Sequence, residues 1–401
     1  MGDILFLAHR VPFPPDRGDK IRGHHVLKFL AARARVHLVA FADDPRDMDC
    51  GKRPTGLASD PTIVRREKAR LTALGEALIQ RQPMSLTAFD HREMRAAVDR
   101  VLTRETIDTI YVFSGQMAQY LPPRAGGRVI MDFVDMDSAK FADYAAESNG
   151  LMAWLMRREA RLLQAFERQI AGQVDAALLV SATEAALFRQ HTGAANVHVV
   201  ENGIDADLYD PVGVMPVAGV GPLIVFTGQM DYRPNVAGVT WFADAILPQV
   251  RARFAAARFA IVGRNPGAAV RALGTRPGIE VTGEVADVRG WLAAAACVVA
   301  PLKVARGVQN KVLEAMAMAR PVVASRAAAE GIDHDGTILV GADAAGLADA
   351  VNRVLADPAG SAGMGAAARR QVVARYGWNA RLAPLDALLG HGVACPARSA
   401  A

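Results

Sequence analysis

The chain has 401 residues, of which 51% are hydrophobic and 22% are charged, and its formal net charge is +5. This length exceeds what one ordinary hydrophobic core serves, so we expect two globular domains. The sequence predicts a cytoplasmic protein without a signal peptide or a membrane span, because no apolar run reaches about 18 residues and the three cysteines form neither a disulfide framework nor a metal-spaced cluster.

The first half of the chain alternates short apolar segments with amphipathic ones. The longest expected helix covers 154–170, and candidate strands cover 4–8, 36–41, 110–113, 128–132, 176–180 and 197–200. Such alternation implies a parallel sheet with helices on both faces. We therefore expect one doubly wound α/β domain over residues 1–210.

The loop after the first expected strand holds a glycine and several charged residues. Gly18, Asp19, Lys20 and Arg22 follow a proline-rich segment and precede a helix. Backbone N–H groups at a helix start attract anions, and Lys20 or Arg22 would add positive charge. The loop is therefore a candidate ligand site. The alternative is a proline-stiffened connection whose charges are solvated.

The excess positive charge is concentrated in residues 52–104, which we call the basic segment. It holds 11 Lys/Arg and 6 Asp/Glu, with the densest run at 65–70. Clustered cations are attracted to anionic lipid headgroups, so one interpretation is contact with a membrane surface. The other is a solvated helix face. We expect no nucleic acid partner, because no nucleic-acid-binding motif accompanies the charge.

An Asp-x-Asp motif follows the expected strand at 128–132, with Asp135 and Asp137 as its carboxylates. Two carboxylates alone would leave a divalent ion dependent on substrate oxygens, so we predict no bound metal. A carboxylate at the end of a strand can instead orient a substrate hydroxyl, and we choose Asp135 for that role.

The pattern of strands and helices repeats in the second half of the chain. Residues 211–222 are rich in Gly and Pro and indicate a linker. Candidate strands then cover 223–227, 259–262, 279–281, 297–300, 321–324 and 338–340. We expect a second doubly wound domain over 223–360, followed by helices over 361–401.

The loop after the strand at 297–300 is the most informative segment. It contains Gly307 and opens a helix at about Asn310, at the edge of the sheet where α/β folds bind ligands. The helix start and Lys311 suit a phosphate, and Gly307 lets the backbone approach it closely. Glu314, one turn further on, suits sugar hydroxyls. The combination indicates a nucleotide-sugar.

Several motifs together resemble a known family. The run Lys311-Val-Leu-Glu314-Ala-Met-Ala, followed by Arg320-Pro-Val-Val, resembles the donor-site signature of family-4 glycosyltransferases of the GT-B fold. The segments 9–15, 135–138 and 226–235 resemble sugar transferases of bacterial PEP-CTERM/exosortase exopolysaccharide systems. The resemblance covers nearly the whole chain. It implies two Rossmann-like domains facing a cleft, with the helices at 361–401 packing back on the first domain.

The resemblance also implies an activity. This would be retaining transfer of a sugar from a nucleotide-diphosphate donor to a glycan or polyprenyl-linked acceptor, without cofactor or metal. The enzyme would be cytoplasmic, at the inner face of the cytoplasmic membrane. The two rival hypotheses are a nucleotide-sugar epimerase of similar fold and a non-catalytic protein that binds sugar nucleotides.

Site residues follow from the same resemblance. The catalytic residues would be Asp135 and Lys311, and the loop with Gly18 would face the donor phosphates and the acceptor. Glu314 would bind the ribose, and the turn at 283–287 would line the base. The donor-binding residues would be Gly228, Arg233, Arg264, Arg306, Gly307, Asn310, Lys311 and Glu314.

The chain departs from the family pattern at four positions. Arg306 stands where the family usually has its first glutamate, and Arg320 stands where it has Gly. Gln229 and Asn235 stand where many members have Arg and Lys to hold the diphosphate. We expect Arg306 and Arg233 to supply part of the missing positive charge.

Overall fold

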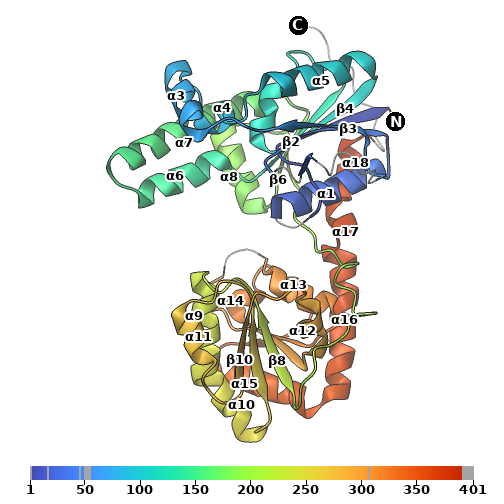
Figure 1. The fold of residues 1–401 in the computed structure, drawn as a ribbon. Coiled ribbons are helices and arrows are strands. Elements are labelled where there is room, and N and C mark those ends of the chain that lie inside the picture. The colour runs from blue at the N-terminus through green and yellow to red at the C-terminus, as the bar shows by residue number, and fades with distance from the viewer. Residues whose placement is uncertain (1, 16–17, 45–46, 49–55, 306–307, 391–401) are drawn as a thin grey trace. The chain divides into compact units, whose positions relative to one another are not determined.

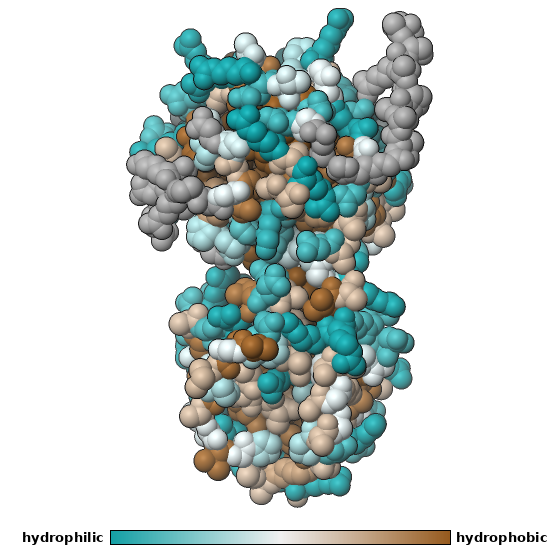
Figure 2. All heavy atoms as spheres, turned by 90° about the vertical axis from the view of Figure 1, so that its right-hand side faces the viewer, coloured by the Kyte–Doolittle hydropathy of each residue, from teal (hydrophilic) through white to brown (hydrophobic). Residues whose placement is uncertain are grey.

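The computed structural model describes residues 2–15, 18–44, 47–48, 56–305 and 308–390. The chain divides into two compact units, of which the first comprises 1–202 with 381–401 and the second comprises 203–380. The division thus falls before the Gly- and Pro-rich segment 211–222. In the face shown in Figure 2, polar and apolar side chains are interspersed on both units.

The first unit is built on a parallel sheet, which has seven strands within the described residues, in the order β3-β2-β1-β4-β5-β6-β7. The strands are β1 (Asp3–Ala8), β2 (Val36–Ala42), β3 (Ser59–Arg65), β4 (Ile107–Phe113), β5 (Arg128–Val134), β6 (Ala176–Leu179) and β7 (Val197–Val199). Every residue of β2 is buried, because helices cover both faces of the sheet.

Helices connect these strands and carry the loops of the carboxyl edge. They are α1 (Gly18–Ala31), α3 (Arg70–Gln80), α4 (Met84–Thr87), α5 (Arg92–Arg104), the 3₁₀ turn η1 (Gly115–Tyr120), α6 (Asp137–Glu147), α7 (Gly150–Ala171) and α8 (Ala182–Thr192). Helices α6 and α7 pack against each other as a hairpin that extends beyond the sheet (Figure 1). Near the end of the chain, α18 (Pro384–Leu388) belongs to this unit, and Asp386 pairs with Arg33 of the segment after α1.

The second unit has a parallel sheet of six strands within the described residues, in the order β10-β9-β8-β11-β12-β13. The strands are β8 (Leu223–Thr227), β9 (Arg258–Val262), β10 (Ile279–Gly283), β11 (Cys297–Ala300), β12 (Val322–Ser325) and β13 (Leu339–Gly341). This order is that of the dinucleotide-binding α/β fold, and it reverses between β8 and β11. Ligands in such sheets bind at the carboxyl ends of the strands where the order reverses.

The helices of the second unit lie on both faces of its sheet (Figure 1). They are α9 (Arg233–Trp241), the π-helical turn η2 (Phe242–Ile246), α10 (Leu247–Arg253), α11 (Ala268–Leu273), α12 (Arg289–Ala294), α13 (Asn310–Ala317), α14 (Arg326–Ala329), α15 (Ala344–Ala356) and α16 (Pro358–Tyr376). Helix α16 packs on α13, so residues 358–376 belong to this unit, and α17 (Trp378–Leu382) spans the second boundary.

The predicted α/β class with two doubly wound domains is confirmed. One strand escaped the sequence pattern: β3 lies within the basic segment, where a helix face was one interpretation. Among the described strands, β3 pairs only with β2, and as an edge strand it tolerates Pro61 and polar residues that a central strand would not. Consequently, residues 66–69 connect a strand to α3 and are not part of a helix.

Candidate functional site

A cavity of about 740 Å³ opens at the carboxyl edge of the second sheet. Its walls come from the segments after β8, β9, β10 and β11, and from the first turns of α13. The residues at its base are Thr227, Gly228, Val262 and Gly263. The cavity therefore lies where the strand order reverses, as the fold predicts, and its volume is typical of small-molecule sites.

Two glycines bring the backbone turns after β8 and β9 together. A Cβ on Gly263 would lie 1.7 Å from the carbonyl oxygen of Gly228, so the position admits only glycine. Gly228 has φ +155°, and a Cβ there would lie 2.8 Å from Nδ2 of Asn235. These contacts leave the base of the cavity lined by backbone, which a ligand can approach closely.

Helix α13 begins at the wall of the cavity. Its N-cap residue, Gln309, has extended backbone angles, and no side chain caps the helix. Val308, Gln309 and Asn310 all line the cavity. Uncapped N–H groups and the positive end of the helix dipole favour an anionic ligand here.

Lys311 places a cation beside this helix start. Its Nζ donates to Oδ1 of Asn235 at 2.6 Å and lies 4.7 Å from the ring centroid of Phe226. Burial lowers the pKa of Lys311 to about 8, although the nearby Glu314 carboxylate opposes the shift. An anion bound next to Lys311 would restore the stability of its charged form.

Asn235 has a role that its sequence position did not reveal. It is 5% exposed, and its Nδ2 donates to the backbone carbonyl of Gln229 at 2.9 Å while its Oδ1 accepts from Lys311. The resembled family has a cation at this position. This chain instead has the Asn235 amide, which holds the cation Lys311 in place. Sequence spacing carries no signal for this contact, because residues 235 and 311 meet only in the folded sheet.

Glu314 lies one turn beyond Lys311 and also lines the cavity. It accepts a hydrogen bond from the hydroxyl of Tyr209, which lies in the segment before β8. Burial raises the pKa of the Glu314 carboxyl. The hydrogen bond from Tyr209 and the charge of Lys311 stabilise its charged form and oppose this shift. The pKa of Tyr209 is raised in turn by burial and by Glu314. A second acceptor oxygen of Glu314 can serve ligand hydroxyls.

Thr227 and the turn after β10 complete the walls. The Oγ1 atom of Thr227 is buried and has no hydrogen-bond partner among the described residues, so it is available to a ligand. Glu284 and Val285, from the turn at 283–287, line the cavity together with Val288, and the expected contact of this turn with a base stays a prediction. The sequence pattern did not identify Tyr209 or Thr227, although Thr227 ends a strand at the functional edge.

The remaining predicted donor residues fall into three groups. Arg264 lines the cavity with an exposed side chain, and its Nη2 donates to Oε1 of Gln229 at 3.3 Å. Arg233 begins α9 with an exposed side chain and is not part of the cavity wall. Arg306 and Gly307 lie outside the described residues, so their expected roles stay predictions.

In the first unit, the structure corrects the expectation for Lys20 and Arg22. Lys20 is 4% exposed and donates to Asp47 at 2.7 Å. Arg22 is 1% exposed and donates to both carboxylate oxygens of Asp132, at 3.0 and 3.2 Å. Both cations are thus paired with buried carboxylates, and removing either carboxylate would leave a buried, unpaired charge at a high cost in stability.

Asp19 and Gly18 open helix α1 near the carboxyl end of β1. Asp19 accepts hydrogen bonds from Arg10 and from Nε2 of His9, the latter at 3.3 Å. The pKa of Asp19 is lowered well below its usual range, because these hydrogen bonds and charges outweigh the opposing effect of burial. Asp19 is therefore paired with Arg10 and hydrogen-bonded to His9, and the predicted phosphate loop is acidic as well as basic.

Polar groups also meet at the carboxyl ends of β1, β4 and β5. Asp135 is exposed there, as its proposed role requires. Asp137 accepts from Nε2 of Gln116 at 3.1 Å, and burial raises its pKa. The nearby His9 stacks on Phe113 with centroids 5.6 Å apart, and its Nδ1 has no partner among the described residues. His9 is a further candidate: it lies directly after β1 and begins the segment 9–15, which the sequence analysis did not assign to the site.

Two glutamates, the buried Glu167 and the half-buried Glu184, accept hydrogen bonds from the start of α6, just behind this edge. Glu167 accepts from the backbone N–H of Ser138 at 3.0 Å and from its hydroxyl at 2.5 Å. Glu184 accepts from the backbone N–H of Met136 at 2.5 Å. Burial raises the pKa of Glu167 to about 7, even though the Ser138 hydrogen bonds favour its charged form. These groups stabilise the helix start that follows Asp135.

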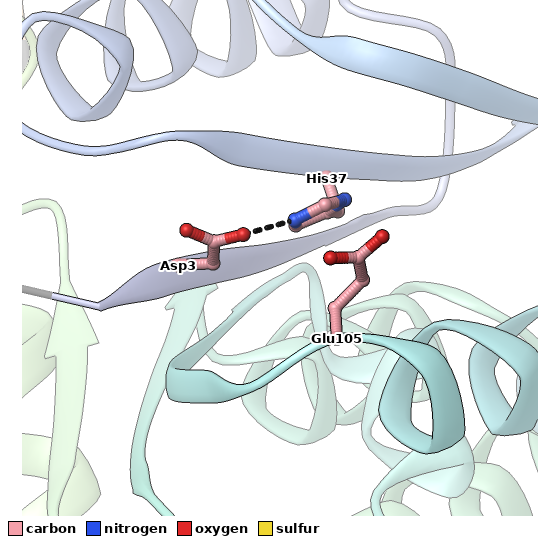
Figure 3. Close-up of side chains that lie close together, drawn as sticks. All are labelled: Asp3, His37 and Glu105. Carbon is pink, nitrogen blue, oxygen red and sulfur yellow. Dashed lines mark hydrogen bonds and ion pairs between the residues drawn. The ribbon is translucent and has the colours of Figure 1, made fainter.

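Within the described residues, one group of three side chains has metal-ligand geometry. Asp3, His37 and Glu105 lie at the opposite edge of the first sheet, with ligand atoms within 4.8 Å of one another (Figure 3). Nε2 of His37 lies 2.7 Å from Asp3, and Nη1 of Arg35 reaches Asp3 at 3.4 Å and Glu105 at 3.3 Å. Because Arg35 already contacts both carboxylates, the cluster is better explained as an ion-pair network.

Several cations of the basic segment have acidic partners in the structure. Arg66 donates to Asp43 at 2.6 Å, and Lys68 donates to Glu76 at 2.7 Å. Arg65 lies 3.1 Å from Glu67, and both are exposed. Glu67 and Glu76 are already counted among the six acidic residues of the segment, so of these three partners only Asp43 offsets its excess positive charge. No helix of the described residues is long and apolar enough to cross a membrane.

The geometry so far defines two Rossmann-like domains, the second with a cavity lined by the start of α13, Lys311 and Glu314. Residues 221–357, from β8 through α15, match the model of a family described as glycosyl transferases group 1. No curated protein sequence matches the chain.

Solved structures resemble the whole chain. Sucrose-phosphate synthase from Thermosynechococcus elongatus matches 97% of this chain and 98% of its own, with a TM-score of 0.60 and 19% identity. HepE of Anabaena in complex with UDP matches 97% of this chain and 100% of its own, with a TM-score of 0.59 and 16% identity. WaaG, a glycosyltransferase involved in lipopolysaccharide biosynthesis, matches 96% of this chain and 100% of its own, with a TM-score of 0.60 and 17% identity. The likeness confirms the predicted GT-B fold.

Proposed function

We propose that the protein is a glycosyltransferase that uses a nucleotide-diphosphate sugar as donor. The observation that carries the proposal is the cavity of the second domain, in which the uncapped start of α13, Lys311 and Glu314 lie within one turn of helix. The family match over this same domain supports it. HepE, which has a similar fold, has been solved with UDP and with UDP-glucose.

The residues suit the separate parts of such a donor. Lys311 and the N–H groups of α13 would bind the diphosphate and stabilise the negative charge that develops on it as the glycosidic bond breaks. Glu314 would accept hydrogen bonds from ribose hydroxyls, while Tyr209 orients its carboxylate. Glu284, Val285 and Val288 would contact the base through backbone and apolar atoms.

Transfer with retention is part of the proposal. The bond between the sugar C1 and the diphosphate oxygen would break while the acceptor oxygen bonds to C1 on the same face. The acceptor proton would pass to the leaving phosphate oxygen, so that no protein nucleophile, cofactor or metal takes part. Asp135, at the carboxyl edge of the first sheet, would orient the acceptor hydroxyl. The acceptor would be a glycan or polyprenyl-linked glycan of a bacterial exopolysaccharide, as the PEP-CTERM/exosortase resemblance suggests.

Thermal unfolding with a panel of nucleotides and nucleotide-sugars tests donor binding. A ligand at about 100 times its Kd stabilises the native state by about 2.7 kcal/mol. Glu314→Gln should weaken the preferred ligand by roughly tenfold to a hundredfold, since hydrogen bonds to charged groups contribute about 1.5–3 kcal/mol. Glu280→Gln is the matched control, because Glu280 is an exposed glutamate on β10 that does not line the cavity.

The reaction itself is tested by incubating the protein with the best ligand, with and without a glycan or lipid-linked acceptor. Product that forms only with acceptor, with the anomeric configuration of the donor, is the expected result. Conversion of the donor sugar without acceptor would instead identify an epimerase. Tight donor binding with no turnover on any acceptor would favour a non-catalytic binding protein.

Peripheral attachment to an anionic membrane belongs to the same proposal. Besides its cations, the basic segment exposes apolar residues on α3, where Leu71 is 83% exposed and Ile79 is 85% exposed. Both features are typical of helices that lie at a bilayer surface. Sedimentation with acidic liposomes at low salt should recover the protein, and Leu71→Ser with Ile79→Ser should reduce recovery. Equal recovery with neutral liposomes would exclude the electrostatic part of this proposal.

A further inference from the structure

A second cavity lies at the opposite edge of the same sheet, at the amino ends of β8, β11 and β12. Its volume is about 500 Å³, which is in the range of ligand sites. We call it the Arg320 pocket and define it by Pro211, Pro222, Arg320, Pro321, Leu355 and Pro358. Because the donor cavity follows the carboxyl ends of the strands and this pocket precedes their amino ends, the two are separated by the length of the sheet.

The walls of the Arg320 pocket are largely apolar. Four prolines and Leu355 line it, together with Val354 and small alanines from the segments before β11 and β12. The first turn of α16 closes one side, and Gly365 holds that helix close, since a Cβ there would lie 2.2 Å from the carbonyl oxygen of Ala319. Such a pocket can enclose a hydrocarbon body.

Arg320 supplies the positive charge of this pocket. Its Nε is buried and has no hydrogen-bond partner among the described residues, and its side chain is half-buried. Burial lowers the pKa of Arg320, and no carboxylate of the described residues opposes that shift. The nearby acidic groups have other partners: Asp210 pairs with Arg369 at 2.8 Å, and Asp357 caps α16 by accepting from Gly360 at 2.9 Å.

Leaving the buried Nε of Arg320 without a hydrogen-bond partner is costly, and pairing the half-buried guanidinium with an anion would reduce that cost. Arginine suits carboxylates and phosphates because its planar fork donates two parallel hydrogen bonds. The backbone already holds Arg320 in place, since its N–H donates to the carbonyl of Ala315 at 3.0 Å and closes α13. The fold thus fixes the backbone of Arg320, and no ion pair within the described residues engages its side chain.

We propose that the Arg320 pocket binds a small anion with an apolar body, such as an aliphatic carboxylate or phosphate monoester. The anionic head pairs with the guanidinium of Arg320, and the body lies against the prolines and Leu355. This site is independent of the proposed donor site and does not require the protein to be a glycosyltransferase.

Calorimetric titration of the full chain tests the proposal with octanoate, octyl phosphate and the neutral octanol as probes. Saturable binding of either anion is expected, and the stronger of the two identifies the head group. Arg320→Gln should weaken that anion at least tenfold. Arg326→Gln is the matched control, because Arg326 is an exposed arginine just beyond the other end of β12, and it should bind as the wild type does.

Ala362→Glu provides a second variant that does not depend on losing Arg320. Ala362 is an exposed residue in the first turns of α16 that lines the pocket, so a glutamate there can pair with the guanidinium and displace the anion. This variant should also abolish binding while the protein stays folded. The proposal is overturned if neither anion binds, if octanol binds as well as they do, or if binding survives both substitutions.

Discussion

Lys311 gives the sharpest prediction, because its charge should depend on pH in the range where the protein can be studied. Burial lowers the pKa of Lys311 to about 8, against 10.5 for an ordinary lysine, and its described contacts are to the Asn235 amide oxygen and the Phe226 ring. A diphosphate bound at the start of α13 would interact with the charged form only. Affinity for UDP should therefore fall as the pH rises through 8.

The magnitude follows from the fraction of charged lysine in the free protein. With a pKa of about 8, roughly nine-tenths of Lys311 is charged at pH 7 and roughly one-tenth at pH 9. If the bound diphosphate keeps the lysine charged, the Kd for UDP rises about tenfold between these two pH values. Lys311→Arg keeps the charge at both, since an arginine stays protonated throughout, so its affinity should not change in this way.

The measurement is calorimetric titration of UDP at pH 7, 8 and 9 for both proteins. Protonation of the nucleotide itself changes the Kd of both proteins equally. The ratio of the wild-type Kd to the Lys311→Arg Kd at each pH therefore reports the titration of Lys311 alone. A ratio that is constant with pH would refute the reasoning, either because Lys311 is not near the diphosphate or because its pKa is ordinary. Lys311→Met distinguishes these two explanations. It should bind UDP weakly at every pH if Lys311 lies near the diphosphate, whereas wild-type affinity in this variant would show that Lys311 is not near it.

Three further predictions concern stability and turnover. Glu167→Gln should remove a pH dependence of stability, because the pKa of Glu167 is raised from 4.5 to about 7 and the native state therefore keeps this proton to higher pH than the unfolded state. Between about pH 4.5 and 7, the free energy of unfolding of the wild type should fall by on the order of 2 kcal/mol relative to that of the variant, as measured by urea unfolding. The same pH dependence in both proteins would contradict this. Gly263→Ala should destabilise the second domain by at least about 2 kcal/mol because of the clash with Gly228, whereas Gly363→Ala, whose Cβ meets nothing within 4 Å, should be neutral or stabilising. Asp135→Asn should lower kcat without altering the Kd for UDP, and a change in UDP affinity instead would show that the residue does not act on the acceptor.

The sequence alone determined the class of fold and much of the cavity at the carboxyl edge of the second sheet. Alternating apolar and amphipathic segments are local patterns, so they predicted both parallel sheets and most of their strands. The loop after β11 and the helical spacing of Lys311 and Glu314 were enough to place both side chains at one sheet edge. The edge strand β3 was missed, because a strand with one neighbour needs less apolar sequence than a central one.

Only the tertiary structure decided which charged residues have partners. Lys20 and Arg22 have the composition of a phosphate loop, yet Asp47 and Asp132, distant in sequence, hold them inside the first domain. Asn235 and Tyr209 in turn acquire roles beside Lys311 and Glu314 that no local pattern contains. The reason is physical: periodicity reports which face of an element is buried, whereas the energy of a charge depends on the groups that folding brings to it from elsewhere in the chain.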